Sequence, residues 1–351
     1  MVDESGELDM TLYTANEAGP AVPAEAAGDL VPLLPPGEVG IKEWWKRRER
    51  LRSEWLEMLG PFPEQTALEP EVLSHESDED HERYLVQYTT EPGARVEAYL
   101  LVPKDLDAPA PAAVVFHSTS SNNILQPVGL ADPPTRHLAL YLTQRGYVTL
   151  SPRNYIFGYG EEITMENLAR ERGANDWRAA RAKLAENQPG LTGMGKMVWD
   201  GMRAVDYLES RPEVDSERIA AVGHSLGAKE ALYAIGFDPR VHAAISSEGG
   251  VGLPLSNWEA PWYLGEQVEA EGFTHDNHEV LALAAPRPFL LIGGGQSDGA
   301  FSWPYIEAVK PVYALYGESD NAGLLLHNGG HNVPVPVREG AFDWLDGYLK
   351  N

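Results

Sequence analysis

The sequence contains no cysteine among its 351 residues. This absence excludes disulfide bonds, a catalytic thiol and metal sites built on thiolates. Positive charge is also scarce, because 27 Lys and Arg stand against 53 Asp and Glu and give a formal net charge of −26. Such a charge repels nucleic acid and anionic lipid at long range. We therefore expect neither of them as a partner, and attribute the acidity either to solubility or to adaptation to high salt.

Long apolar runs are missing as well. No stretch approaches the roughly 20 apolar residues that a transmembrane helix needs. The N-terminus, Met1 to Ser5, lacks the basic and apolar regions of a secretory signal. We expect a cytoplasmic protein, unless a secretory signal has been removed from a longer precursor.

Periodicity and composition divide the chain into an arm and a domain. Residues 1–38 are rich in Ala, Pro, Gly and acidic side chains, which predicts an extended or flexible N-terminal arm. Residues 41–59 carry Trp and Leu at helical spacing among Lys and Arg, which predicts an amphipathic helix that packs its tryptophans on the main body. Residues 39–351 are expected to form a single domain.

Apolar strand-like segments then alternate with helical or looped stretches, after a predicted hairpin over 84–89 and 94–102. This pattern predicts an α/β fold with a mostly parallel central sheet and helices on both faces. Residues 154–192 and 249–286 exceed ordinary loop lengths, so we expect them to form a lid or the rim of a pocket. The predicted strands that follow the hairpin are 112–116, 147–150, 219–222, 241–245, 289–292 and 322–326.

The motif Gly-His-Ser-Leu-Gly at residues 223–227 lies between one of these strands and a helix-favouring run. This context is typical of a nucleophile elbow, a strained turn that exposes the serine hydroxyl. Ser225 is therefore the predicted nucleophile. The helix that follows directs backbone N–H groups toward a developing oxyanion, which makes Leu226 N–H one expected donor, and Ser118, after strand 112–116, the expected second.

A serine nucleophile needs a general base, and that base needs a carboxylate to orient it. In this type of fold the acid and then the histidine follow the serine along the chain. His331 lies in a glycine-rich loop after the last predicted strand and is the predicted general base. Asp298 and Glu248 both follow predicted strands, and either could be the carboxylate that orients the histidine. Strand order favours Asp298, and Glu248 is the alternative.

Three further residues are candidates for contact with substrate. Trp258 and Trp262 either stack on a sugar or an acyl group, or simply pack the lid. Arg153, at a strand end that opens into the crevice, either pairs with a substrate carboxylate or anchors a loop. His275 and His278 are spaced to share a metal on a helix, but no third ligand at fitting spacing is evident. No metal and no cofactor are expected.

The elbow, residues 194–250 and the Ala-Pro-Arg-Pro segment at 285–288 resemble the dienelactone-hydrolase-like and acetyl-xylan-esterase-like branch of the α/β-hydrolases. The resemblance covers about residues 40–350 and implies a metal-free serine hydrolase that acts on esters. The related glucuronoyl esterases share a segment like 285–288, and some place their acid where Glu248 stands. A serine in place of the cysteine of true dienelactone hydrolases means that a lactone substrate is not implied.

The sequence thus predicts a serine carboxylester hydrolase for small or carbohydrate esters, working through an acyl-enzyme. A peptidase or acyltransferase of the same fold remains an alternative, and so does a binding module without activity, because a fold alone never establishes chemistry. The expected partner is a small-molecule ester, and the oligomeric state is left open.

Overall fold

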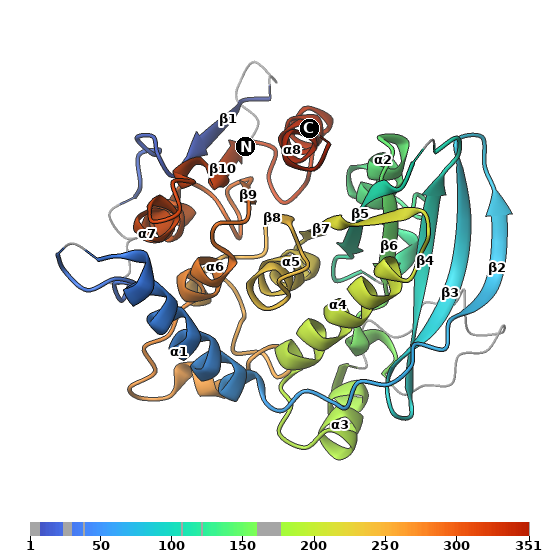
Figure 1. Ribbon diagram of the computed structural model, residues 1–351, viewed down its shortest axis with the longest axis horizontal. Helices are drawn as coiled ribbons and strands as arrows, with labels where there is room; N and C mark the ends of the chain where they lie inside the picture. Colours follow the sequence, from blue (N-terminus) through green and yellow to red (C-terminus); the bar gives the residue numbers. More distant parts are fainter. Residues whose placement is uncertain are drawn as a thin grey trace.

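The computed structural model describes residues 8–23, 30–37, 39–106, 108–120, 122–159 and 177–350. Strands and helices alternate through most of the described chain (Figure 1). The strands are β1 Met10–Thr14, β2 Glu71–Ser77, β3 His81–Glu91, β4 Ala94–Pro103, β5 Ala110–Phe116, β6 Val148–Pro152, β7 Val214–His224, β8 Ala243–Ser247, β9 Phe289–Gly293 and β10 Ala322–His327. The α-helices are α1 Ile41–Leu59, α2 Leu138–Gln144, α3 Trp177–Asn187, α4 Gly193–Glu209, α5 Leu226–Phe237, α6 His278–Ala284, α7 Trp303–Ala314 and α8 Val335–Leu349.

All strands of the described residues form one sheet with the order β1-β10-β9-β8-β7-β5-β6-β4-β3-β2. The central strands from β6 to β10 run parallel, while β2, β3, β4 and β1 pair antiparallel at the two edges. The predicted parallel core and hairpin are therefore present. The edge strands β1 and β2 were not predicted, because their residues are largely exposed and lack a clear apolar alternation.

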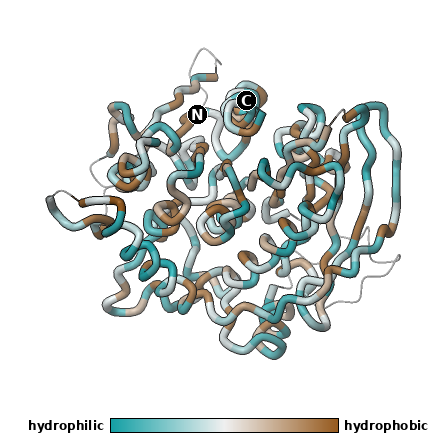
Figure 2. Tube along the Cα trace, viewed as in Figure 1, coloured by the Kyte–Doolittle hydropathy of each residue, from teal (hydrophilic) through white to brown (hydrophobic). Residues whose placement is uncertain are grey.

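Helices cover both faces of the sheet, as Figure 1 shows, with α4, α5, α6 and α7 on one side and α2 and α8 on the other. The central strands β5, β6, β8 and β9 are buried along their whole length, as expected for strands covered on both faces. Figure 2 shows the outer strand β2 as mostly hydrophilic, in agreement with the exposure of its side chains.

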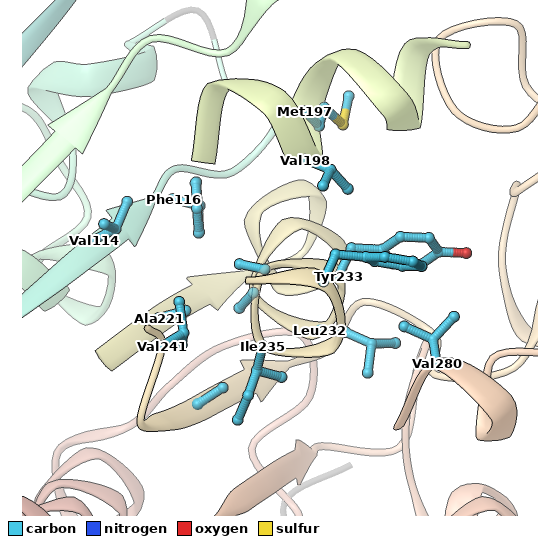
Figure 3. Packing of buried hydrophobic residues seen from close by; sticks show 14 of the residues in the cluster. Val114, Phe116, Met197, Val198, Ala221, Leu232, Tyr233, Ile235, Val241 and Val280 are labelled. Atoms are coloured by element: carbon cyan, nitrogen blue, oxygen red, sulfur yellow. The ribbon is translucent and has the colours of Figure 1, made fainter. Parts of the chain in front are cut away.

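The core beneath the elbow is formed by β5, α4 and α5. Figure 3 shows Phe116 of β5 and Met197 and Val198 of α4 beside the apolar side chains of α5. Helix α4 starts where the Thr192 hydroxyl accepts a hydrogen bond from Gly195 N–H at 3.0 Å, a side-chain cap that satisfies one free donor of the first turn. This packing fixes α5, and with it the residue that precedes its first turn.

Helix α1 packs on the main body through Trp44 and Trp55, which are fully buried, as its spacing predicted. Trp45 is half exposed. In the N-terminal arm, β1 extends the sheet by pairing with β10. The predicted lid over 154–192 is described only in part: it contributes α3, and its residues 160–176 lie outside the described ranges. Within those ranges no helix combines the length and apolar character needed to cross a membrane.

Candidate active site

Ser225 occupies the sharp turn between β7 and α5. Its backbone has φ 59° and ψ −114°, a conformation that L-residues rarely adopt and that costs about 1–3 kcal/mol. The flanking glycines permit the turn, because a Cβ at Gly223 would collide with the Gly227 carbonyl and one at Gly227 with the Phe116 carbonyl. The predicted nucleophile elbow is therefore present in the backbone.

The turn is tied to the neighbouring strand by backbone contacts. Ser225 N–H donates to the Ser247 carbonyl at 2.8 Å, at the end of β8. Leu226 follows as the first residue of α5, where backbone N–H groups have no partner inside the helix. Ser225 and Leu226 both line the same cavity. The expected first oxyanion donor is thus positioned at the cavity.

His331 lies in the loop after β10, and its Nδ1 is 3.2 Å from Glu248 Oε2. The ring also packs edge-to-face on His224, the residue before the nucleophile, with ring centroids 4.7 Å apart. In the described residues no direct hydrogen bond joins the Ser225 hydroxyl to His331. Such a bond often tightens only when substrate is bound. The imidazole is therefore oriented by a carboxylate and lies beside the elbow.

Glu248 is the buried carboxylate that orients this ring. Its side chain is fully shielded from solvent. Its two oxygens accept hydrogen bonds from Gly294 N–H and, at 2.8 Å, from Ser297 N–H. Its backbone has φ 56°, in the left-handed region. Three donors therefore hold the carboxylate in one orientation.

Asp298, the preferred acid in the sequence reasoning, does not contact His331. Its Oδ2 accepts from Gly250 N–H and its Oδ1 from Val251 N–H, both at 2.8 Å, and the Ser302 hydroxyl donates at 2.9 Å. Burial raises the pKa of Asp298 to about 6, against the opposing effect of these backbone donors. The preference for Asp298 over Glu248 is therefore reversed by the geometry. Asp298 instead braces the loop that follows Glu248.

The second predicted oxyanion residue, Ser118, is buried. Its carbonyl contacts His117 Nδ1, and its hydroxyl accepts from Arg136 Nη1 at 3.0 Å. The residue of this loop that lines the cavity is Thr119. Arg136, which sequence reasoning missed, also donates to the His331 carbonyl, so it joins the loop after β5 to the histidine loop. Burial lowers the pKa of Arg136 to about 10.

Arg153 is an anchor and not a substrate contact. Its guanidinium binds the buried Glu97 carboxylate through Nε at 2.8 Å and Nη2 at 2.6 Å, and Nη1 donates to Asn123 Oδ1 at 2.7 Å. These partners bind the guanidinium N–H groups that a substrate carboxylate would need. Of the two interpretations left open by the sequence, the structure supports loop anchoring.

The cavity at the elbow encloses about 1100 Å³, including space open to solvent. Its size and aromatic walls fit a pocket for an organic ligand. Half-buried Trp262 lines it, and so does Trp177 of α3, whose ring centroid lies 4.6 Å from that of Trp262. Trp258, by contrast, is only 1% exposed, and its indole N–H donates to the Gly250 carbonyl at 2.9 Å. Trp262 therefore remains a candidate for substrate contact, and Trp258 packs the loop.

Lys229, one turn after the nucleophile on α5, also lines the cavity and was missed in the sequence. Its ammonium donates to the Gly249 carbonyl at 2.6 Å and lies 4.1 Å from the Trp258 ring centroid. Burial lowers the pKa of Lys229 to about 7. Its position in the first turn of the helix that follows Ser225 is the signal that could have identified it, since that turn borders the nucleophile.

Three other histidines, His117, His275 and His278, are bound by protein groups away from the elbow. His117 binds the Ser118 carbonyl and receives Asn154 N–H at 3.0 Å, and burial lowers its pKa to about 4, so its ring stays neutral. His275 contacts Glu279 at 2.6 Å while His278 contacts the Val31 carbonyl, so the two do not converge. Within the described chain no cluster of three His, Asp or Glu side chains suits a metal.

Comparison with known proteins bears on the family and the fold of the chain. Residues 96–266 match the Dienelactone hydrolase family. YtaP of Bacillus subtilis (strain 168) is 24% identical over 320 residues, which are 86% of this chain and 100% of that protein. 4-O-methyl-glucuronoyl methylesterase 1 of Wolfiporia cocos (strain MD-104) is 28% identical over 193 residues, which are 44% of this chain and 46% of that protein.

Among solved structures, a glucuronoyl esterase from Solibacter usitatus superposes with a TM-score of 0.66 at 19% identity. The alignment covers 88% of this chain and 94% of that one. At this identity the likeness establishes the fold. The resemblance predicted from the sequence is confirmed: the chain has the α/β-hydrolase fold, and its residues 96–266 match the dienelactone hydrolase family.

Proposed function

We propose that this protein is a serine esterase that hydrolyses carbohydrate esters through an acyl-enzyme intermediate. The observation that carries the proposal is the contact of His331 with the buried Glu248 beside the elbow that presents Ser225 to the cavity. A nucleophile, a base and an orienting acid in this chain order are the requirements for acyl transfer. The names of the relatives, a glucuronoyl methylesterase among them, support a carbohydrate ester as substrate.

In this mechanism Ser225 attacks the ester carbonyl while His331 accepts the hydroxyl proton. Glu248 binds Nδ1–H, which fixes the tautomer in which Nε2 is the base, and stabilises the imidazolium that forms. Leu226 N–H binds the oxyanion. His331 then donates its proton to the leaving alcohol, and a water activated by the same imidazole hydrolyses the acyl-enzyme.

The second oxyanion donor belongs in this proposal to the loop after β5. Thr119 lines the same cavity as Ser225, whereas Ser118 is buried and does not line it. We therefore assign the second donor to the backbone N–H of Thr119 in place of Ser118. Arg136 donates to both this loop and the His331 loop and so positions them relative to each other.

The test is a hydrolysis panel with purified wild-type protein and Ser225→Ala. The panel contains acetylated xylan, a methyl glucuronate ester, short 4-nitrophenyl esters and a peptide anilide. We expect turnover of the esters, with a sugar ester preferred, and loss of at least about 10⁴-fold in Ser225→Ala. Turnover of the anilide alone would identify a peptidase, and unchanged turnover in a folded Ser225→Ala protein would refute the serine mechanism.

A further inference from the structure

The cavity at the elbow is lined by basic side chains in a protein whose net charge is −26. Its lining contains two basic side chains, Arg178 and Lys229, and one carboxylate, Glu248. Because burial lowers the pKa of Lys229 to about 7, Arg178 is the side chain of the two that stays fully charged at neutral pH. The Glu248 oxygens are already bound by His331 and by two backbone N–H groups. Glu248 is thus engaged elsewhere, and Arg178 presents a positive charge at the cavity that would attract an anionic group against the general field of the molecule.

The two basic side chains differ in whether protein groups already bind their N–H donors. The Lys229 ammonium donates to the Gly249 carbonyl and lies over the Trp258 ring, so protein groups already surround it. Arg178 is exposed, and its guanidinium carbon lies 4.5 Å from the Trp177 ring centroid. In the described residues no carboxylate pairs with Arg178. A guanidinium beside an aromatic ring keeps in-plane N–H donors that match a carboxylate in bidentate geometry.

The position of Arg178 is fixed by the docking of α3 on the loop that forms the cavity wall. Trp177 packs against Trp262, with ring centroids 4.6 Å apart. Arg181, one turn later on α3, donates through Nε to the Pro261 carbonyl at 3.0 Å. Two independent contacts thus hold the start of α3 against residues 261–262. Arg178 is consequently a positioned group at the wall of the site and not a freely placed surface charge.

We propose that Arg178 binds a free carboxylate that the substrate carries in addition to its scissile ester. The preferred substrates are then acidic esters, such as esters of saccharides that bear an unesterified acid group. The inference rests on the proposed esterase function and adds the charge of the substrate to it. A charge-assisted bidentate bond of this kind accounts for about 10–100-fold in kcat/KM.

The experiment compares charged and neutral esters that are otherwise matched. One pair places the charge on the acyl group: 4-nitrophenyl hemisuccinate and 4-nitrophenyl butyrate. The other places it on the alcohol: 4-acetoxybenzoate and 4-acetoxybenzamide. The proteins are wild type, Arg178→Gln, Arg178→Lys and the control Arg50→Gln, which removes an equal charge from an exposed position on α1. The kcat/KM is measured for each combination at low salt and at molar salt.

We expect Arg178→Gln to lower kcat/KM by about 10–100-fold for the charged ester of one pair and by less than about threefold for the neutral ester of that pair. Arg178→Lys should lose an intermediate amount, because it keeps the charge but not the fork. Arg50→Gln should match wild type. Equal losses on charged and neutral esters of both pairs, or no loss on any, would overturn the role of Arg178. So would an equal loss in Arg50→Gln, which would indicate a general field effect.

The outcome also separates this inference from the function on which it rests. If wild type hydrolyses the neutral esters and Arg178→Gln shows no dependence on charge, the esterase proposal stands and the acidic-substrate inference fails. If wild type remains folded and hydrolyses neither these four esters nor the sugar esters of the panel above, both fail.

Discussion

The matched substitutions Glu248→Gln and Asp298→Asn distinguish the two carboxylates at the site. Each exchanges one oxygen for an amide nitrogen with little change of shape. Glu248 accepts from His331 Nδ1 at 3.2 Å and from two backbone donors. A glutamine there has a single acceptor oxygen for three donors, so its amide nitrogen must oppose either the ring or a backbone N–H. The wrong imidazole tautomer is then favoured, and the imidazolium loses its counter-charge.

We expect Glu248→Gln to lower kcat by about 10³–10⁴-fold, which corresponds to about 4–5.5 kcal/mol of transition-state stabilisation. Asp298→Asn should keep kcat within about tenfold, since its oxygens bind Gly250, Val251 and Ser302 and not the ring. It should instead cost about 1–3 kcal/mol of stability, because one buried N–H loses its acceptor. Steady-state kinetics and thermal unfolding of both variants measure these effects. A nearly inactive Asp298→Asn with an active Glu248→Gln would refute the assignment.

Three further predictions concern stability and substrate contact. Burial raises the pKa of Glu230, on α5, to about 8, so the folded protein loses stability as pH rises from the pKa of the unfolded chain to about 8. The stability of Glu230→Gln relative to wild type should therefore increase from about pH 5 to about pH 8 in denaturant titrations. A difference that does not depend on pH would contradict this. Trp258→Ala should lower the free energy of unfolding by about 3–5 kcal/mol, whereas Trp262→Ala should mainly raise KM for sugar esters; the reverse pattern would exchange their roles. Because the net charge is −26, added salt should raise Tm by screening self-repulsion, and a flat or falling Tm up to molar salt would count against it.

The parallel core, the elbow and the histidine loop were predictable because each depends on a local pattern. Fully apolar strands, a Gly-x-Ser-x-Gly turn and a glycine-rich loop after the last strand are visible without knowledge of packing. The edge strand β1 was not predictable, because its pairing with β10 joins residues more than 300 positions apart and its side chains are largely exposed.

The choice of acid could not be made from sequence for a related reason. Glu248 and Asp298 follow adjacent parallel strands, β8 and β9, so their side chains leave the sheet at the same edge. Which one reaches His331 depends on the loop backbone. Glu248 has φ 56° and meets the ring, while Asp298 turns back to bind Gly250 and Val251. Neither loop conformation can be predicted from the composition of the loop or from residue spacing.

The substrate contacts depend on tertiary structure in the same way. Trp258 and Trp262 are four residues apart in one loop, yet the first is buried under Lys229 and the second lines the cavity. Trp177, which packs on Trp262, comes from a different segment of the chain. Arg153 lies at a strand end that the sequence associated with substrate contact, but its guanidinium is bound by Glu97 of a neighbouring strand.

The central claim is that Ser225 is a nucleophile activated by His331. It is tested most directly by reacting the protein with a fluorophosphonate and locating the adduct by peptide mass spectrometry. We predict a stoichiometric adduct on Ser225, with labelling slowed strongly in His331→Ala and Glu248→Gln and near normal in Asp298→Asn. No adduct, or an adduct on another serine with Ser225 unmodified in the folded protein, would contradict the account.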